Sequence, residues 1–304
     1  MQSPRRLLQS VWRARRIYCF VLPGVAFYLI FRYYPLYYLQ IAFRDFRITR
    51  PLQKCAWVGF RFFKEVFSSV SFADALKNTL IINLLKLIFC FPMPILVALM
   101  LNELRSIHFK RAVQTVLYLP HFVSWVVIAS IIMNFTTLYG GLFNNILTAL
   151  GHDPILFLGR KDLFRPILVL SDVWKESGYG AIIYLSALTS IDPQLYDAAS
   201  IDGANRLQRI WHVSLAGIKN VVVMMLILRV GAMMSGNFDQ VQTLINEQVR
   251  PVGDTLDTFV YRLGISNNRH SFATAAGLFN SAVGAVLLIL SDQVAKRLGE
   301  QGLI

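Results

Sequence analysis

Long apolar runs alternate with short polar segments along the whole chain. A helix needs about 20 mostly apolar residues to cross a bilayer, and six runs approach or exceed that length. These six runs cover residues 17–42, 78–102, 112–136, 166–188, 219–237 and 271–291. The last run is the clearest, because it contains no charged side chain between Ser271 and Ser291. The pattern predicts an all-α integral membrane protein with about six transmembrane helices.

Charge at the N-terminus indicates how these helices are oriented. Five arginines, with no acidic residue among them, precede or open the first run: Arg5, Arg6, Arg13, Arg15 and Arg16. Such an excess marks the cytoplasmic side of a first span. No small-x-small cleavage site comes after the run, so we read it as a retained span. We predict a cytoplasmic segment at 1–16, one membrane domain over 17–304, and both termini in the cytoplasm.

Composition supports this class and excludes others. Of the 304 residues, 55% are apolar and 15% charged, whereas soluble domains carry about 25% charge. The net charge of +13 fits side chains that face the headgroups of membrane lipid. Nucleic-acid binding is not expected, because no basic run is interleaved with aromatics on a solvated element. No HExxH, CxxC or P-loop motif occurs, so we expect no metal, no cofactor bound by this chain and no enzymatic activity of its own.

The polar segment 193–217 carries the start and stop signals of two short helices. Asp192 followed by Pro193 is typical of a helix start, because the carboxylate accepts from free N–H groups and proline has no N–H to leave unpaired. Asp202 and Gly203 form a turn dipeptide, in which glycine takes positive φ and the aspartate can cap the second helix. We predict two helices joined at an angle and exposed in the cytoplasm.

An ordinary connector would not need the residues found at this bend. Small residues line it and leave room for another backbone to approach: Ala198, Ala199, Gly203 and Ala204. The second helix also carries Trp211, which is costly to leave in water. A docking element explains the segment better than a solvated linker does.

The motif D-A-A at Asp197 is followed by D-G-A at Asp202 and then by Ile210 and Leu215. This spacing resembles the "EAA" loop of binding-protein-dependent ABC importers, approximately E-A-A-x-x-D-G-A and later I-x-L-P. The chain is most similar to maltose-type sugar permeases, in their polysaccharide and oligosaccharide branch. Further segments that resemble this branch are 57–69, 254–265 and 272–284.

The resemblance implies a type I ABC importer permease fold in the bacterial cytoplasmic (inner) membrane. It also implies a second related permease, an extracytoplasmic solute-binding protein, and two ATP-binding subunits that use ATP and Mg. In this family the loop is a coupling helix that sits in a cleft of the ATPase. The residues expected to couple are Asp197, Ala198, Ala199, Asp202, Gly203, Ala204, Arg206, Ile210 and Trp211.

Two positions depart from the family's pattern. The usual glutamate is Asp197, which is one methylene shorter, so its contact with the ATPase must be adjusted. The usual proline is Ala216, so the second helix is expected to run on without a kink.

Ionisable residues within spans are expensive and are candidates for function. Segments 171–180 and 233–242 correspond to spans that line the sugar path in maltose-type relatives, which implies that aromatic rings stack on the sugar and amides bind its hydroxyls. The candidate path residues are Asp172, Trp174, Lys175, Glu176, Tyr179, Arg229, Asn237 and Gln240. Two structural alternatives stay open: Asp172 and Lys175 neutralise each other at i,i+3, and the aromatics anchor span edges.

Basic residues favour an acidic cargo. The first long loop has a basic excess, and Lys86, Lys175 and Arg229 lie within predicted spans. Cationic walls attract carboxylates, so a uronate oligomer such as an alginate or pectin fragment fits best. Alternatively, the basic loop docks an acidic binding protein and the cargo is a neutral oligosaccharide. An ion-coupled secondary transporter could use Asp172 or Glu176, but it leaves the segment 193–217 unexplained.

Overall fold

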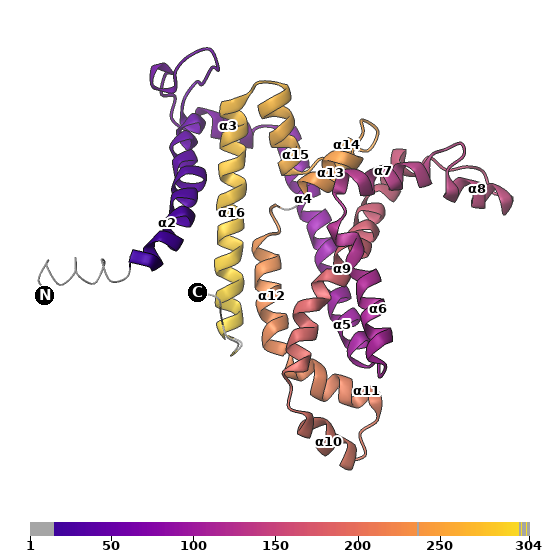
Figure 1. Cartoon of the computed structure of the whole chain (residues 1–304). Coiled ribbons are helices and arrows are strands. Elements are labelled where there is room, and N and C mark those ends of the chain that lie inside the picture. Colours follow the sequence, from indigo (N-terminus) through magenta and orange to yellow (C-terminus); the bar gives the residue numbers. More distant parts are fainter. Residues whose placement is uncertain (1–14, 236, 298, 300–301, 303–304) are drawn as a thin grey trace, which may run out of the picture.

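The computed structural model describes residues 15–235, 237–297, 299 and 302. The predicted cytoplasmic segment 1–16 lies outside these residues except for its last two. The described part of the chain contains helices and no β-strand, with one isolated bridge between Arg44 and Trp57. The all-α prediction is confirmed, and Figure 1 shows the helices as an elongated bundle.

The described helices succeed one another in two halves. Those of the first half are α2 (Arg15–Tyr28), η1 (Leu29–Tyr33), η2 (Tyr34–Phe43), η3 (Leu52–Lys54), α3 (Arg61–Phe67), α4 (Val70–Phe89), α5 (Pro92–Asn102), α6 (Ile107–Tyr118), η4 (Leu119–Phe122), α7 (Trp125–Thr136), α8 (Leu142–Ala149) and η5 (Phe157–Gly159). Those of the second half are α9 (Lys161–Thr189), α10 (Pro193–Ile201), α11 (Arg206–Arg209), η6 (Ile210–Leu215), α12 (Lys219–Gly231), α13 (Phe238–Leu244), α14 (Arg250–Gly253), α15 (Leu256–Tyr261), η7 (Arg262–Ser266) and α16 (His270–Arg297).

Several of these helices can cross a membrane. Within the described residues, three segments are long and apolar enough: Arg16–Phe43, Val70–Asn102 and His270–Arg297. Two bent pairs of helices raise the number to five if each pair is one span. The remaining predicted span, 166–188, lies in α9, which has 29 residues but carries three charged side chains in its middle. The chain is therefore a multi-pass membrane protein whose least apolar long helix, α9, runs through the centre of the bundle (Figure 1).

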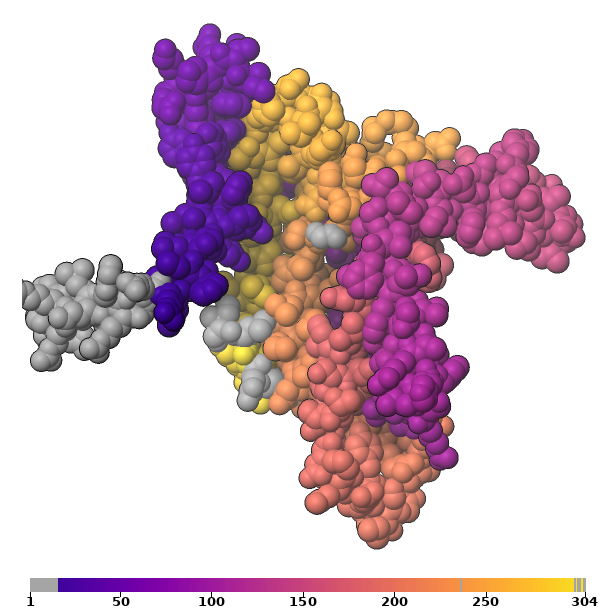
Figure 2. Space-filling model, viewed as in Figure 1, coloured from indigo at the N-terminus to yellow at the C-terminus, as the bar shows by residue number. Residues whose placement is uncertain are grey.

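The apolar run 112–136, predicted as a span, is broken into two helices. The chain turns by 97° between η4 and α7. Val123 is extended (φ −82°, ψ 132°), and the Ser124 hydroxyl then accepts from the Val127 N–H and starts a new helix. As a result, α7 and α8 project sideways from the bundle as an arm, which Figures 1 and 2 both show.

The predicted span 219–237 is also shorter than expected as a helix. Helix α12 ends at Gly231, and Ala232 leaves the helical region (φ −86°, ψ 1°). The chain resumes as a helix at Phe238, so Asn237 lies at the start of α13 instead of at the end of α12. This places Asn237 on a separate short helix that packs beside α7 and α15.

The start of α2 and the end of α16 point toward the same end of the bundle as α10 and α11 (Figure 1). The six predicted crossings, an even number, would place both termini on this side. Helix α2 stands apart from the rest, and the side chains of its apolar segment are exposed in the single chain. Its surface must therefore be covered by lipid or by a partner subunit.

Helices α5 and α9 pack along each other, and α6 lies close to α9. The approach of α6 depends on Gly178, because a Cβ built there would lie 2.0 Å from the Leu117 carbonyl oxygen. We expect Gly178→Ala to push α6 outward and to destabilise the fold by about 1–3 kcal/mol. Thermal unfolding of the purified protein in detergent measures the effect. Gly277→Ala is the matched control, since a Cβ at that position would meet nothing within 4 Å; equal unfolding temperatures for the two variants would contradict this account of the packing.

Candidate functional site

A buried polar network centred on Lys86 joins three helices of the bundle. Lys86 lies on α4 and is 2% exposed. Its Nζ donates to Asp172 Oδ1 at 3.0 Å, to Asn237 Oδ1 at 2.7 Å and to Gln240 Oε1 at 2.5 Å. An ammonium group has three donors, and each has an acceptor here. The charge is therefore buried without an unpaired donor, which makes the burial tolerable.

The side-chain amides of Asn237 and Gln240 form hydrogen bonds through both their oxygen and their nitrogen atoms. The Asn237 amide nitrogen donates to Asn83 Oδ1 at 2.7 Å, and that of Gln240 donates to Ser171 Oγ at 2.8 Å. Both side chains are buried. In this conformation Asn237 and Gln240 hold α13 against α4 and α9. Their predicted role as partners of sugar hydroxyls stays a prediction.

Arg229, on α12, is the outermost member of the network. One of its terminal nitrogens lies 3.5 Å from Asp172 Oδ2, so Asp172 is shared between Lys86 and Arg229. The Arg229 side chain is 42% exposed, whereas that of Asp172 is 9% exposed. Asp172 therefore separates a fully enclosed cation from a cation that reaches open space.

That space is a cavity of about 400 Å³ between α5, α7, α9 and α12. It is lined by Cys90, Phe91, Pro94, Trp125, Asp172, Glu176, Ser177, Tyr179, Gly180, Tyr184, Met225, Leu228, Arg229 and Ala232. Aromatic and apolar walls with a few charged groups are typical of ligand sites. Four predicted path residues, contributed by α9 and α12, meet at this one cavity: Asp172, Glu176, Tyr179 and Arg229.

A second polar cluster ties the turn at η4 to α9 beside the cavity. His121 Nδ1 lies 2.8 Å from Glu176 Oε2, and the His121 ring stacks on Tyr179 with centroids 3.8 Å apart. Lys175 Nζ donates to the His121 carbonyl at 2.6 Å and lies 5.6 Å from the centre of the Trp125 ring. Glu176 and Lys175 are thus fixed by the same turn that redirects α7.

The other four predicted path residues do not line the cavity. Lys175, Asn237 and Gln240 are buried beside it without lining it, and Trp174 is 52% exposed and does not line it. The alternative pairing of Asp172 with Lys175 is not formed, because Asp172 bonds Lys86 and Lys175 bonds Glu176 and the η4 turn.

Several residues of the site were not among the predicted ones, and three of them have a clear part in it. Asn83 and His121 complete the two polar clusters, and Trp125 contributes a wall of the cavity. For His121 and Trp125, the sequence LPHFVSW, 119–125, held a usable signal. Polar residues with a proline in the middle of an apolar run are typical of a break in the helix.

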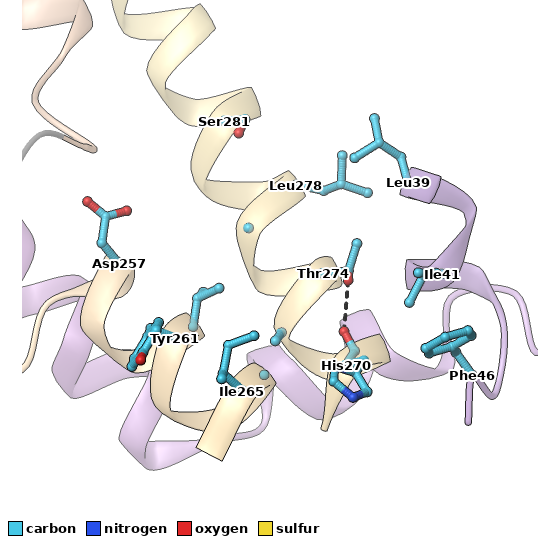
Figure 3. Close-up of a pocket in the computed structure, with 14 residues that line it drawn as sticks. Leu39, Ile41, Phe46, Asp257, Tyr261, Ile265, His270, Thr274, Leu278 and Ser281 are labelled. Carbon is cyan, nitrogen blue, oxygen red and sulfur yellow. Dashed lines mark hydrogen bonds between the residues drawn. The ribbon is translucent and has the colours of Figure 1, made fainter. Parts of the chain in front are cut away.

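A larger cavity, of about 550 Å³, lies between η2, α15, η7 and α16 and is shown in Figure 3. Its walls are mostly apolar, with Leu39, Ile41 and Leu278 on one side. The Thr274 hydroxyl donates to the His270 carbonyl at 2.8 Å, so this polar group is already used. Other polar side chains also line this cavity, including Asp257 and Ser281, but no lysine or arginine among the described residues does, whereas Arg229 lines the smaller one. The smaller cavity is therefore the better site for an anionic ligand.

The polar segment forms two helices joined at Gly203, as predicted. Asp192 accepts from the Gln194 N–H at 2.9 Å at the start of α10. Gly203 has φ +80°, and the N–H of Ala204 then closes the turn on the Ala199 carbonyl at 2.9 Å. The segment projects as the end of the molecule opposite the α7–α8 arm (Figure 1).

The predicted cap of the second helix is wrong. Asn205, not Asp202, starts α11: its side chain accepts from the Gln208 N–H at 3.0 Å, and Gln208 Oε1 accepts from the Asn205 N–H at 2.7 Å. This reciprocal capping box satisfies two backbone donors. Gly203 and Ala204 therefore lie between the last residue that caps α10, Asp202, and the first that caps α11, Asn205.

The expectation that the second helix runs on without a kink is also wrong. The axis bends by 64° between 206–215 and 219–231. Ile218 leaves the helical region (φ −98°, ψ 5°) and is fully buried in a core cluster formed with α5 and α9. A buried apolar anchor thus produces a bend close to the position where the family's pattern has proline.

The predicted coupling residues divide between an exposed surface and a support. Trp211, a predicted coupling residue, is 67% exposed, and Ile201 and Leu207, which were not predicted, are 86% and 77% exposed. Large apolar groups therefore face outward at this end of the chain. Ile210 packs inward against the core cluster of α5 and α9. Arg206 Nε lies 2.5 Å from Glu103 Oε2 at the end of α5. The loop is therefore held against α5 while its apolar face is exposed, which is typical of a docking surface.

Comparisons with known proteins agree with this geometry. A family model described as "Binding-protein-dependent transport system inner membrane component" matches residues 91–300. The chain is 41% identical over 302 residues to the "Polygalacturonan/rhamnogalacturonan transport system permease protein YteP" of Bacillus subtilis, covering 99% of this chain and 94% of that protein.

Two solved structures are similar over nearly the whole chain. One is described as "Crystal structure of bacterial alginate ABC transporter in complex with alginate pentasaccharide-bound periplasmic protein"; it has a TM-score of 0.90 and 38% identity and covers 98% of this chain and 100% of that one. The other is a bacterial ABC transporter "involved in the import of the acidic polysaccharide alginate", with a TM-score of 0.89, 38% identity, and coverage of 96% and 99%.

Proposed function

The chain belongs to the family of inner membrane components of binding-protein-dependent transport systems, and we propose that it forms part of the translocation path for an acidic oligo- or polysaccharide. In this proposal it is the permease subunit of an ATP-driven sugar importer in the bacterial cytoplasmic membrane. The cargo is a uronate chain of the alginate or pectin type. This subunit hydrolyses nothing itself, because ATP and Mg are used by its partners.

The observation that carries the proposal is the charge around the cavity. Three cationic side chains line it or contact its lining, namely Lys86, Lys175 and Arg229, against the two carboxylates of Asp172 and Glu176. This leaves one surplus positive charge in a space with apolar walls, where fields are weakly screened and attract anions. The names of the relatives, which include polygalacturonan and alginate, support the same class of cargo.

The apolar surface at the end of α10 and α11 supports the proposed partners. We expect this surface to bind an ATP-binding subunit, one of two in the complex, beside a second related permease. The periplasmic protein in the similar alginate structure supports an extracytoplasmic solute-binding partner for this chain. The loop and both termini would then lie in the cytoplasm.

The packing offers a path from the loop to the cavity. Arg206 is bonded to Glu103 at the end of α5, and α5 packs along α9, which carries three lining residues, Asp172, Glu176 and Tyr179. A push on α11 therefore moves α5 and α9 together. A rigid-body motion of this kind can open and close the cavity without local unfolding.

The neutral-sugar alternative uses the basic first loop to dock a binding protein. Two of that loop's basic residues are engaged within the chain: Arg44 donates to the Cys55 carbonyl at 2.9 Å, and Arg61 pairs with Glu65 at 3.3 Å. The pairing with Glu65 offsets the charge of Arg61, and the bond to the carbonyl restricts the Arg44 side chain, so both are less available to a partner. The ion-coupled alternative requires a free carboxylate, whereas Asp172 and Glu176 are both paired.

Uptake into proteoliposomes tests the proposal. The chain is co-purified with the products of neighbouring genes, reconstituted, and supplied with uronate or neutral oligosaccharides of matched length. We expect uptake to require ATP and Mg and to favour the uronate. Equal or faster uptake of the neutral sugar would contradict the cargo, and uptake driven by an ion gradient without ATP would contradict the mechanism.

A further inference from the structure

Arg229 differs from the other two cations near the cavity. Lys86 uses its three donors on Asp172, Asn237 and Gln240. Lys175 is buried, with its ammonium on the η4 turn and on Glu176. Among the residues that the structure describes, Arg229 has one polar contact, the 3.5 Å approach to Asp172, although a guanidinium has five donors. Of these three cations, Arg229 is therefore the one whose N–H donors are mostly available to a ligand.

The contact between Arg229 and Asp172 is also a loose one. Charge-assisted N–H···O bonds are about 2.7–2.9 Å long, so 3.5 Å is well beyond the favoured distance. Asp172 is committed to Lys86 at the shorter distance of 3.0 Å. A competing carboxylate could therefore take Arg229 without leaving Asp172 as an unpaired buried charge. Exchange of one carboxylate for another costs little electrostatic energy in this arrangement.

From this geometry we infer that Arg229 binds the carboxylates of the cargo as they pass through the cavity, and that Asp172 holds its guanidinium in place between them. The inference rests on the proposed function and assigns the discrimination between acidic and neutral sugar to one side chain. A guanidinium fork matches a carboxylate with two parallel hydrogen bonds. A neutral sugar offers no such group, so it leaves Arg229 with its loose contact.

The surroundings of Arg229 suit a uronate ring as well as its carboxylate. Trp125 and Tyr179 line the same cavity and present aromatic surface, while Arg229 supplies the charge. A sugar ring has apolar faces and polar edges, so a site with both kinds of wall can hold it. The weak hold of Asp172 also keeps the site reversible, which transport requires because each carboxylate must leave again.

The test measures the ratio of uronate to neutral oligosaccharide uptake in the reconstituted complex. Arg229→Gln is expected to lower this ratio about tenfold or more, because a charge-assisted pair is worth enough to change affinity by that factor. Arg229→Lys keeps the charge and the approach to Asp172 but loses the fork, so it should lower the ratio by a smaller factor. Arg32→Gln, at an exposed arginine of η1 in the first span, is the control and should leave the ratio unchanged.

The outcomes separate this inference from the proposed function. If the unmodified complex shows no preference for uronate, the proposed cargo fails and this inference fails with it. If the preference exists and both Arg229 variants keep it, only the role of Arg229 is overturned. Arg229→Gln could instead lower uronate and neutral-sugar uptake equally while Arg229→Lys leaves their ratio unchanged. That result would mean that Arg229 has a structural role, and it would also overturn the inference.

Discussion

Replacing Gly203 by proline is expected to abolish uptake while the chain still inserts and assembles. Gly203 has φ +80°, whereas proline fixes φ near −65°. Proline would also remove the N–H that Gly203 donates to the Ser200 carbonyl at 3.2 Å. The turn would then point α11, and the exposed Leu207 on it, in another direction. Insertion should persist, because Gly203 is exposed and belongs to none of the core clusters of the described residues.

The same turn provides graded and matched variants. Asparagine visits the left-handed region at little cost, so Gly203→Asn should keep most of the uptake. A bulky residue at Ala199, which lines a recess between the two helices with Gly203 and Ala204, should act like proline. Uptake and cargo-stimulated ATP hydrolysis are measured together, with membrane fractionation as the control for insertion. Normal coupled hydrolysis in Gly203→Pro would contradict the role of the bend.

Replacing Lys86 by methionine is expected to cause the largest loss of stability, about 3–5 kcal/mol. Among the described residues, the substitution leaves Asp172 with the 3.5 Å approach to Arg229 as its one ion pair. It also removes the donor to the side-chain oxygens of Asn237 and Gln240, which are buried. Unpaired buried groups of this kind are costly because they have lost water without gaining a partner. Thermal unfolding of the purified protein in detergent reports the change.

Two further variants decide whether the loss comes from the ion pair. Adding Asp172→Asn to Lys86→Met removes the orphaned charge and should recover much of the stability. Lys77→Met changes a lysine outside the network on the same helix, α4, and should have little effect. A Lys86→Met protein as stable as the unmodified one, or a double variant no better than the single one, would show that the network does not hold these helices together.

Local signals are sufficient for much of the fold. Apolar run length identifies the membrane helices, and the residues Asp192, Pro193 and Gly203 place α10 and the bend after it. The cap at Asn205 is also readable, because asparagine followed three residues later by Gln208 is a capping-box pattern. Asp202 lies beside Gly203 and has a side chain that can cap a helix. However, Gly203 and Ala204 form the turn, so the second helix begins only after Asn205.

The direction of apolar segments is harder to predict. The run 112–136 has the composition of a span whether the helix crosses the membrane or turns along it, and the 97° bend results from the extended Val123 and the cap at Ser124. Likewise, the bend at Ile218 depends on where its side chain is buried. Both are decided by tertiary packing, which a local pattern does not contain.

The hydrogen-bond partners within the site also depend on tertiary packing, so the local sequence does not predict them. Asp172 bonds Lys86, which is 86 positions away, and not Lys175 on its own helix. Periodicity places both Asp172 and Lys175 on α9 but says nothing about which residues face them. The amides of Asn237 and Gln240 were expected to face a sugar, whereas the structure turns them to Lys86, Asn83 and Ser171.

The central claim is that the bend at Gly203 transmits the work of an ATPase to the bundle, and crosslinking tests it most directly. A photoreactive residue is placed at Ile201, with Tyr139, which is 82% exposed on the α7–α8 arm, as the control site. In the assembled complex we expect Ile201 to crosslink to an ATP-binding subunit, with a yield that changes when ATP and the loaded binding protein are added. Crosslinks from Ile201 to lipid alone, or none at all in a complex that transports, would contradict the claim.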